Sequence, residues 1–403
     1  MDKKTIRLPR LILGAVVLLV AGILYAWSVI KEPFSVSGFG WGDTQLGFNY
    51  TLTIAMFCIG GFVSGLFENK ISSKIRMLIA GILIFIGFFV TSKLNQDSIA
   101  LLYLGYGVCS GFGIGIVYNI VIARTNAWFP DKKGISSGVL MMSFGFGALL
   151  LGKLSIKLFE MESFGWRKTY LVYAIAIGAI IALSGLLIRG PKDEEIQKFI
   201  KVDSKASDVV SKDFTTLEMV KRKSFWMLFI LLVLSTAVGT VALSWGKDVL
   251  LSIDVAKDVA ITVAGLLAIF NGVGRLIAGW IFDFFGLKAA KITMSLTCLS
   301  ASVIVLISLM IPNTILGIIG IGLCAFSYGF APTVAAAVSS QFYGKKNFAL
   351  NFATVNLILI PSSFYSTIAG KVYESTQSFE IVFILLIACC VVGLIDGLLI
   401  KKP

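Results

Sequence analysis

Histidine is absent from this chain of 403 residues, and only 14% of its residues are charged. Soluble globular domains carry about 25% charged residues, so this shortage excludes an ordinary soluble enzyme, a disordered chain and a nucleic-acid-binding protein. The lack of histidine also excludes histidine metal ligands, general bases and proton relays. We therefore expect a protein that is not an enzyme and that has no metal site and no cofactor.

The six cysteines form no pattern typical of a metal site or a disulfide framework. None has C-x-x-C spacing, and all lie in apolar runs rather than in loops, where extracellular disulfides would be found. We interpret them as small packing residues of membrane helices: Cys58, Cys109, Cys298, Cys324, Cys389 and Cys390.

Apolar stretches long enough to cross about 30 Å of hydrocarbon recur along the whole chain. The first follows a basic N-terminus. Because no small-residue cleavage site ends it, we expect a retained membrane helix and not a signal peptide. The pattern predicts an all-α polytopic membrane protein with twelve transmembrane helices. The expected spans are 11–30, 46–67, 77–92, 99–123, 135–155, 169–188, 225–246, 259–282, 289–311, 314–338, 349–370 and 379–400.

Segment 189–224 divides the predicted helices into two sets of six. It carries nine Lys and Arg and seven Asp and Glu, so we expect it to lie in water. We expect an N-terminal six-helix half over 1–188, a linker over 189–224 and a C-terminal six-helix half over 225–403. Within the linker, the stretch 215–226 is expected to form a short helix at the membrane surface.

The basic residues predict the orientation in the membrane. Of the 35 Lys and Arg, 25 fall in the termini and loops on one side and nine on the other, which leaves Arg275 inside a span. Cytoplasmic segments collect basic residues, so both termini are predicted to be cytoplasmic in a multi-pass protein of the inner membrane. One outer loop opposes the trend, with Lys153, Lys157, Arg167 and Lys168.

Two pairs of loops indicate an internal repeat. Residues 65–74 match residues 279–288 at an offset of 214, and residues 128–134 match residues 341–347 at an offset of 213. Two loops at nearly one offset predict two pseudo-symmetric six-helix halves. Parallel repeats of this kind build one large class of transporters, in which the substrate site lies at the interface of the halves.

The first pair of loops resembles the Gly-x-x-x-Asp-Arg-x-Gly-Arg-Lys loop of the major facilitator superfamily. The second copy keeps Gly279 and Asp283, whereas in the first copy Asn69 stands for the acid and Ser72 for the glycine. The resemblance implies the twelve-helix fold of that family, with the two loops gating its inner side. The gating candidates are Asn69, Lys74, Asp283, Gly286 and Lys288.

Finer motifs resemble the oxalate/formate antiporter and bacterial monocarboxylate transporter branch of that superfamily. They are residues 22–29 in the first helix, the glycine-rich fourth helix ending in Tyr118, and residues 128–134, 165–167 and 271–275. This resemblance implies transport of a small carboxylate, and activity as a monomer.

Arg275 is the one basic residue in the interior of a predicted span, about seven residues or roughly 10 Å from its inner end. A membrane arginine persists mainly in a polar cavity with a partner, and a guanidinium matches a carboxylate bidentately. Asn271 lies one turn earlier on the same face and can add a donor. The alternative is an arginine that packs against backbone carbonyls or extends toward the interface.

In the resembling branch the arginine of helix 8 binds the substrate carboxylate, and oxalate antiporters add a lysine in helix 11. Leu359 stands where we place that lysine, and the first basic residue of this helix is Lys371. One fixed cation favours a monoanion such as lactate, pyruvate or formate over oxalate. Asn356 of the same stretch is a further binding candidate.

Aromatic and amide side chains are expected along the cavity wall. Phe326 and Phe330 are four residues apart and share a helix face, and with Tyr118 they resemble substrate-contacting positions of the monocarboxylate branch. For each aromatic residue, plain packing is the alternative. The wall candidates are Tyr25, Trp27, Tyr118, Asn119, Phe326 and Phe330.

The sequence gives the weakest support for a site that couples transport to protons. Asp248 and Asp254, near the outer ends of helices 7 and 8, are candidate proton acceptors, and the alternative is that they are solvated loop acids. We expect a carrier that works by alternating access, with proton symport or anion exchange. The alternative function is an oxalate/formate-type carboxylate antiporter. A membrane anion sensor without transport would belong to another class, and no large regulatory domain indicates one.

Overall fold

The structure is a computed structural model that describes residues 3–36, 39–41, 43–192, 195 and 213–400. Every regular element within these residues is helical. The packing of the chain divides it into two compact units. The first unit is Met1–Asp131, Ser143–Val209 and Phe352–Thr354; the second is Lys132–Met142, Val210–Asn351 and Val355–Pro403. The division into halves at 1–188 and 225–403 stays a prediction about the repeat.

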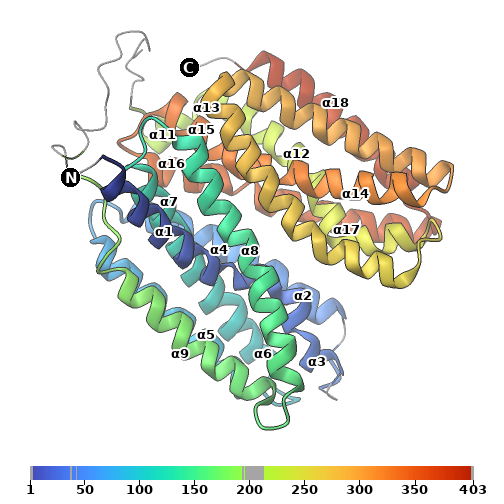
Figure 1. Ribbon diagram of the computed structural model, residues 1–403, viewed down its shortest axis with the longest axis horizontal. Coiled ribbons are helices and arrows are strands. Elements are labelled where there is room, and N and C mark those ends of the chain that lie inside the picture. The colour runs from blue at the N-terminus through green and yellow to red at the C-terminus, as the bar shows by residue number, and fades with distance from the viewer. Residues whose placement is uncertain (1–2, 37–38, 42, 193–194, 196–212, 401–403) are drawn as a thin grey trace. The chain divides into compact units, whose positions relative to one another are not determined.

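The first unit contains the helices that come first in the chain (Figure 1). Helix α5 packs along α9, and α4 packs along α7. The bounds are α1 Lys3–Ala21, η1 Gly22–Ala26, α2 Trp27–Ile30, α3 Glu32–Val36, α4 Asp43–Leu66, α5 Ser73–Ser92, α6 Ile99–Leu102, η2 Tyr103–Ser110, α7 Gly111–Asn126, α8 Lys133–Glu160 and α9 Gly165–Ser184. Helix α8 belongs to this unit only from Ser143 onward.

The second unit contains the start of α8 and nearly all of the later helices. Helix α13 packs against α14 and α18, and α12 packs against α14, α17 and α18. The bounds are α11 Thr216–Val220, α12 Lys223–Leu251, α13 Lys257–Met310, α14 Thr314–Tyr328, α15 Phe330–Tyr343, α16 Phe348–Asn356, α17 Leu359–Thr376 and α18 Glu380–Leu399.

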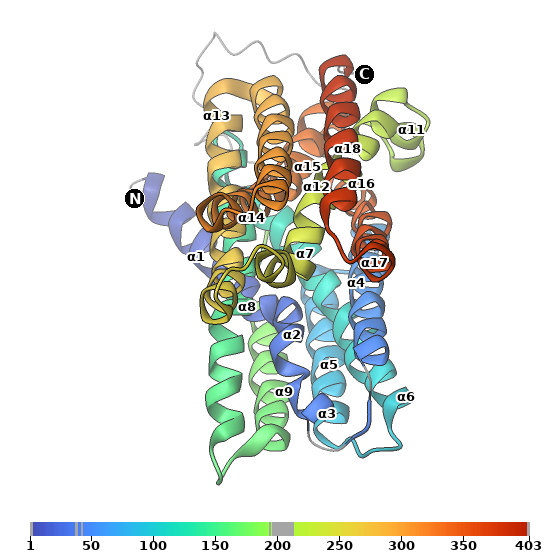
Figure 2. The same cartoon turned by 90° about the vertical axis from the view of Figure 1, so that its right-hand side faces the viewer.

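Eleven helices within the described residues are long and apolar enough to cross a membrane. One of them, α13, has 54 residues and would be roughly 80 Å long if straight, far more than one crossing of about 30 Å. Gly286 breaks it with φ 79°, and the ribbon turns back in Figure 2. Helix α13 therefore supplies two crossings, and the twelve predicted spans are confirmed.

Gly286 makes this turn possible because its φ lies in the left-handed region, which glycine adopts without a Cβ clash. The sequence marked Gly286 as a loop residue of the repeated motif. Its conformation gives the physical reason for a glycine at that place.

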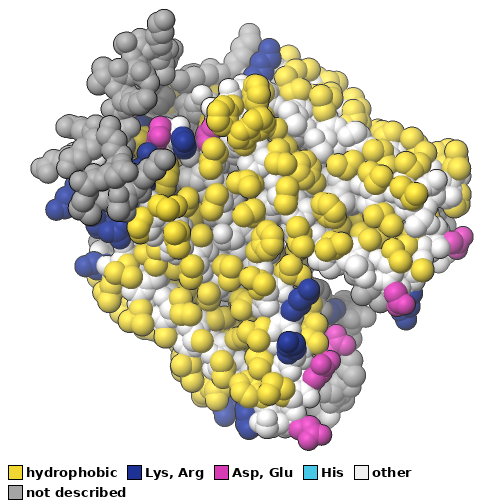
Figure 3. All heavy atoms as spheres, viewed as in Figure 1, with side chains coloured by type: hydrophobic (Ala, Val, Ile, Leu, Met, Phe, Trp, Pro, Cys, Tyr) yellow, Lys and Arg dark blue, Asp and Glu magenta, His cyan; other side chains and the backbone are white. Residues whose placement is uncertain are grey.

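Large hydrophobic side chains cover much of the surface. Leu183 is 63% exposed, Ile315 is 69% exposed and Leu399 is 61% exposed. On the face shown in Figure 3, hydrophobic side chains predominate and charged ones gather toward the margins. Soluble proteins do not expose apolar surface on this scale, so these helices face lipid.

A short helix, α11, precedes α12 as predicted, but it covers only Thr216–Val220 and ends before α12 begins at Lys223. Its place at the membrane surface stays a prediction. Thr215 and Glu218 form a capping box at its start, which satisfies backbone N–H groups that the helix leaves unpaired. The indole of Trp226 donates to the carbonyl of Val220 at 2.9 Å and so ties the end of α11 to the first turn of α12.

A second tie holds the chain that follows α9. The indole of Trp128 donates to the carbonyl of Arg189 at 2.8 Å, and the guanidinium of Arg189 lies over the same ring. Arg189 also pairs with Glu195, and its hydrogen bonds lower the pKa of the Glu195 carboxyl to about 2.

Candidate functional site

Arg275 lies in α13 and is 2% exposed. Its Nε donates to Oδ1 of Asn271 at 3.1 Å, and its Nη1 donates to the carbonyl of Met141 at 2.5 Å. A guanidinium has only donors, so Asn271 must turn its amide oxygen toward Arg275. Asn271 therefore orients the arginine, and its own NH₂ group has no acceptor among the described residues and can donate to a ligand.

The charge of Arg275 has no acid beside it among the described residues. Within that part of the chain, no carboxylate lies within 4.0 Å of its nitrogens. A carbonyl and an amide oxygen stabilise a guanidinium but do not neutralise it, and an uncompensated charge in a membrane-spanning segment is costly. The site is therefore electrostatically suited to an anion.

Close backbone contacts hold this part of α13 in place. A Cβ at Gly274 would overlap the carbonyl of Phe326, and a Cβ at Gly329 would overlap the carbonyl of Asn271. Thr333 donates to the carbonyl of Arg275 at 3.3 Å. Small residues allow helices to approach at backbone distance, so Asn271 and Arg275 sit on a rigid platform shared with α14 and α15.

Four of the helices that carry candidate residues are irregular, whereas α13 is regular around Asn271 and Arg275. A 3₁₀ segment at Gly22–Ala26 interrupts the first span, and a π-helix at Tyr103–Ser110 interrupts the fourth. The tenth tightens at Gly329, whose N–H donates to the carbonyl of Phe326 at 3.1 Å, and the eleventh is interrupted between Asn356 and Leu359. Discontinuous membrane helices commonly build transporter sites because their free backbone groups face a cavity.

The break in the eleventh span has a local cause. Pro361 has no N–H to donate to the carbonyl of Leu357, and the chain forms tighter bonds instead, from Ile358 to Val355 and from Ile360 to Leu357. Asn356 is the last residue of α16 and is buried, and Leu359 is the first residue of α17. Both thus border the break.

In the first unit the structure brings Tyr25 and Tyr118 together. Their rings lie 5.3 Å and 5.1 Å from the ring of Phe144, and Tyr118 also stacks on Phe352 at 6.2 Å. Asn119 is buried next to Tyr118, with its Cβ toward Gly61 of α4. Tyr25 and Tyr118 therefore form one aromatic wall, and Asn119 faces a different helix.

Trp27 belongs to a separate cluster. Its indole donates to the carbonyl of Leu46 at 3.0 Å, and its ring lies 4.7 Å from the ring of Tyr106. The packing alternative fits this residue better than a role in substrate contact, because its one polar group is already bonded.

Phe326 and Phe330 contact each other across the turn at Gly329 in the tenth span, with ring centroids 5.5 Å apart. Phe330 is fully buried and Phe326 is half-buried. The carbonyl of Phe326 lies against Gly274, next to Arg275. Phe330 follows Gly329, whose backbone lies against Asn271 and Arg275.

The candidate proton acceptors lie far from Arg275 along the chain. Asp258, at the start of α13, is 17 residues before Arg275, which is about 25 Å along a helix. Asp254 is exposed and precedes this helix, and Asp248 is half-buried at the end of α12. The solvated alternative therefore fits Asp254, while Asp248 keeps some shielding.

The carboxylate of Asp283 binds the first turn of α8 through two hydrogen bonds. Its Oδ1 accepts from the N–H of Gly134 at 2.8 Å, and its Oδ2 accepts from the N–H of Ile135 at 2.7 Å. Helix N-termini attract anions because their N–H groups are unpaired and the helix dipole is positive there. Lys133 of the same turn donates to Ser340 at 2.5 Å. Asp283 is thus a side-chain clamp on α8.

The other gating candidates do not form this clamp. Asn69, Lys74 and Lys288 are exposed. In the first copy of the loop Arg76 takes the organising role, because it is 4% exposed and donates to the carbonyls of Ile71 and Ser64. Sequence reasoning missed Arg76, although a basic residue at the start of a span was a visible signal.

Sequence reasoning also missed three buried polar groups in the first unit. Asn49, Tyr106 and Ser110 have side-chain polar atoms without a hydrogen-bond partner among the described residues. Asn49 faces Gly107 of the π-helix, and Tyr106 and Ser110 lie in that helix.

Replacing Asn49 by leucine should raise the thermal unfolding temperature of the purified protein by a few degrees. An unpaired buried amide costs about 1–3 kcal/mol, and leucine has a similar size. The control is Thr53→Val, which removes the bond from Thr53 to the carbonyl of Asn49 at 2.7 Å and should lower the temperature. A fall for Asn49→Leu would mean that a bound water or solute pairs with the amide.

The fold and the buried cation together define a polytopic helical membrane carrier. The family model of the Major Facilitator Superfamily matches residues 11–364, and the chain belongs to that superfamily.

Similar proteins include the "Uncharacterized MFS-type transporter YhjX" of Escherichia coli (strain K12), 27% identical over 83% of this chain and 80% of the relative. The oxalate:formate antiporter of Oxalobacter formigenes is 23% identical over 83% and 78%. Monocarboxylate transporter 12 of Homo sapiens is 23% identical over 82% and 68%. Among solved structures, the proton:xylose symporter XylE has a similar fold, with a TM-score of 0.76, 15% identity and coverage of 98% and 97%.

Proposed function

We propose that this protein is a secondary active carrier of small monocarboxylates, of the lactate, pyruvate or formate class. The observation that carries the proposal is Arg275, a buried cation in a membrane helix with no acid beside it among the described residues. A carboxylate would supply the missing charge and match the guanidinium fork. Two of the similar proteins are named for oxalate and formate and for monocarboxylates.

A monoanion is preferred over a dianion because Arg275 is the one buried cation in the middle of a described span. Arg76 and Lys291 are buried too, but Arg76 lies in the first turn of α5 and Lys291 lies five residues after the turn at Gly286. Leu359 at the break of the eleventh span occupies the place where a second cation would stand, and it is half-buried.

Within the second unit, the pair Phe326 and Phe330 would contact the short apolar part of the substrate. Tyr25 and Tyr118 of the first unit stay proposed contacts. Site residues and substrate class are both part of this proposal.

The proposed cycle is alternating access with proton coupling, in a monomer of the inner membrane with both termini in the cytoplasm. Orientation rests on the bias of 25 basic residues against nine. Asp248 is the better of the two proposed proton acceptors because it is partly shielded. Anion exchange, as named for the Oxalobacter relative, is the alternative mechanism.

The test is uptake into proteoliposomes of labelled lactate, pyruvate, formate and oxalate, each with and without a pH gradient. Accumulation of a monocarboxylate driven by an inwardly directed proton gradient supports symport. A strict requirement for internal anion supports exchange instead. Absence of uptake for all four anions, in vesicles whose protein is correctly folded, contradicts the proposed substrate class.

Leu359→Lys should extend the substrate range toward dicarboxylates. A second cation at the break of the eleventh span would attract a second carboxylate, and one charge-assisted bond is worth about 1.5–3 kcal/mol or roughly tenfold or more in affinity. The measurement is competition of oxalate against labelled formate. Leu359→Met is the control, because it keeps the length of the side chain without the charge, and equal oxalate inhibition of both variants would contradict the prediction.

A further inference from the structure

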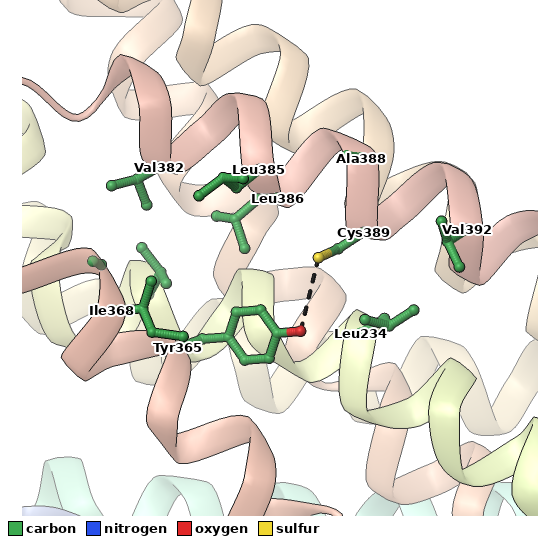
Figure 4. A pocket seen from close by; sticks show the side chains of 11 residues that line it. Leu234, Tyr365, Ile368, Val382, Leu385, Leu386, Ala388, Cys389 and Val392 are labelled. Atoms are coloured by element: carbon green, nitrogen blue, oxygen red, sulfur yellow. Dashed lines mark hydrogen bonds between the residues drawn. The ribbon is translucent and has the colours of Figure 1, made fainter. Parts of the chain in front are cut away.

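A cavity of about 390 Å³ lies between α12, α17 and α18 in the second unit (Figure 4). Its size is that of a ligand pocket. Leu234 comes from α12, Tyr365 and Ile368 come from α17, and Leu386 and Cys389 come from α18.

The lining of this cavity is almost entirely hydrocarbon. Its side-chain polar groups are the hydroxyl of Tyr365 and the thiol of Cys389, and the thiol donates to the hydroxyl at 3.8 Å (Figure 4). None of the described residues that line it carries a charge. A carboxylate would lose its hydration there without compensation, so the ligand must be apolar and different from the transported anion.

The cavity opens toward lipid. Ile368 is 46% exposed, Leu385 is 48% exposed and Val392 is 53% exposed, and all three both line the cavity and belong to helices that cross the membrane. An apolar ligand can therefore enter sideways from the bilayer, whose interior consists of lipid acyl chains.

One end of the cavity lies beside an aromatic cluster typical of the membrane interface. The ring of Tyr373 stacks on Phe379 at 4.3 Å and lies 6.3 Å from Trp245, and the indole of Trp245 donates to the carbonyl of Ser366. Aromatic belts mark the headgroup level of a bilayer. Lys371 is exposed one turn beyond Ile368 on the same face of α17.

We propose that this cavity binds one acyl chain of an anionic phospholipid, with the headgroup phosphate held by Lys371. The apolar lining takes the chain, the opening at Ile368 and Leu385 admits it, and the aromatic cluster and Lys371 place the headgroup. The bound chain fills the space between α17 and its neighbours and so stabilises the helix that begins at the Leu359 break.

The test uses phosphatidylglycerol with a photoactivatable diazirine in the middle of one acyl chain, incorporated into proteoliposomes of the full chain. After illumination and digestion, label should concentrate on peptides covering 365–369 and 382–392. Label no denser there than on other lipid-facing peptides, such as those of α9, would overturn the proposal.

Two variants make the test specific. Ala388→Phe puts a ring into the cavity from an exposed position and should reduce labelling of these peptides by at least about fivefold, because several methylenes no longer fit. Ala176→Phe is the matched control, an exposed alanine of α9, and should leave labelling unchanged. Equal labelling of the two variants would overturn the proposal.

The headgroup part is tested with Lys371→Met and a second probe, diacylglycerol with the same diazirine chain. The variant should label less with phosphatidylglycerol and equally with diacylglycerol. Loss with both probes, or with neither, would overturn the assignment of the phosphate to Lys371. Formation of a dimer that excludes both lipids from 365–392 would overturn the acyl chain as the occupant.

Discussion

Arg275→Met should reduce the initial rate of monocarboxylate uptake by at least about 100-fold at substrate concentrations below saturation. The substitution removes the charge and both arms of the fork, and two charge-assisted hydrogen bonds are worth roughly 3–6 kcal/mol. Arg275→Lys keeps the charge but not the planar fork, so it should raise KM more than it lowers kcat. The measurement is the dependence of uptake rate on substrate concentration in proteoliposomes.

The control for this series is Arg222→Met, because Arg222 is exposed and lies before α12, outside the spans. It should leave uptake unchanged. The thermal unfolding temperature of each variant separates loss of function from loss of fold, since Arg275 also donates to the carbonyl of Met141. Undiminished uptake by a folded Arg275→Met protein would show that Arg275 packs structurally, as the alternative interpretation has it.

The spans could be predicted from sequence because hydropathy is local. A run of apolar residues reports its own burial in lipid whatever its neighbours are, and every predicted span has a helix in the structure. Gly286 was recognised as part of a motif, and its left-handed φ follows from the sharp turn that the motif must make.

The interruptions of the helices could not be predicted from the same pattern. The π-helix at Tyr103–Ser110 and the 3₁₀ segment at Gly22–Ala26 keep the hydropathy of a continuous helix, so nothing in the composition signals them. Two interruptions had a local sign, a missing proline N–H: Pro361 after the break before Leu359, and Pro332 after the turn at Gly329.

The partners in the site depend on tertiary contacts. Arg275 stood out in the sequence as a charge in an apolar run, but its bond to the carbonyl of Met141 involves a backbone atom 134 residues away. Backbone acceptors are the same in every residue and leave no trace in sequence. For the same reason the bond from Trp27 to the carbonyl of Leu46 could not be predicted from the sequence. Nothing in the sequence therefore indicated that the indole N–H of this wall candidate is already bonded.

The repeat was visible in the loops but did not reveal which residue would organise each copy. In the second copy Asp283 accepts two backbone N–H groups. In the first copy Asn69 is exposed and Arg76 donates to backbone carbonyls instead. A motif match therefore predicts that a turn exists, whereas charge and burial decide which side chain holds it.

Asp283→Ala should release the first turn of α8 and slow transport by roughly tenfold or more. The carboxylate accepts from Gly134 and Ile135, and the loss of two bonds and of a favourable helix-dipole interaction amounts to about 2–4 kcal/mol. Helix α8 belongs to the second unit up to Met142 and to the first unit from Ser143. A carrier that changes conformation along this helix depends on how firmly its first turn is held.

Hydrogen exchange gives the most direct measurement of this clamp. In Asp283→Ala the amides of Gly134 and Ile135 should exchange about 30-fold faster or more, since roughly 2 kcal/mol of local protection is lost. Asp283→Asn keeps the shape but leaves one acceptor and turns an NH₂ group toward an N–H, so its amide exchange rates should be close to those of Asp283→Ala.

Asn69→Ala is the control that the repeat itself provides, because Asn69 occupies the matching position and is exposed. It should alter neither exchange nor uptake. Unchanged exchange at Gly134 and Ile135 in Asp283→Ala would contradict the clamp. Faster exchange with unchanged uptake would mean instead that the clamp holds α8 without limiting transport.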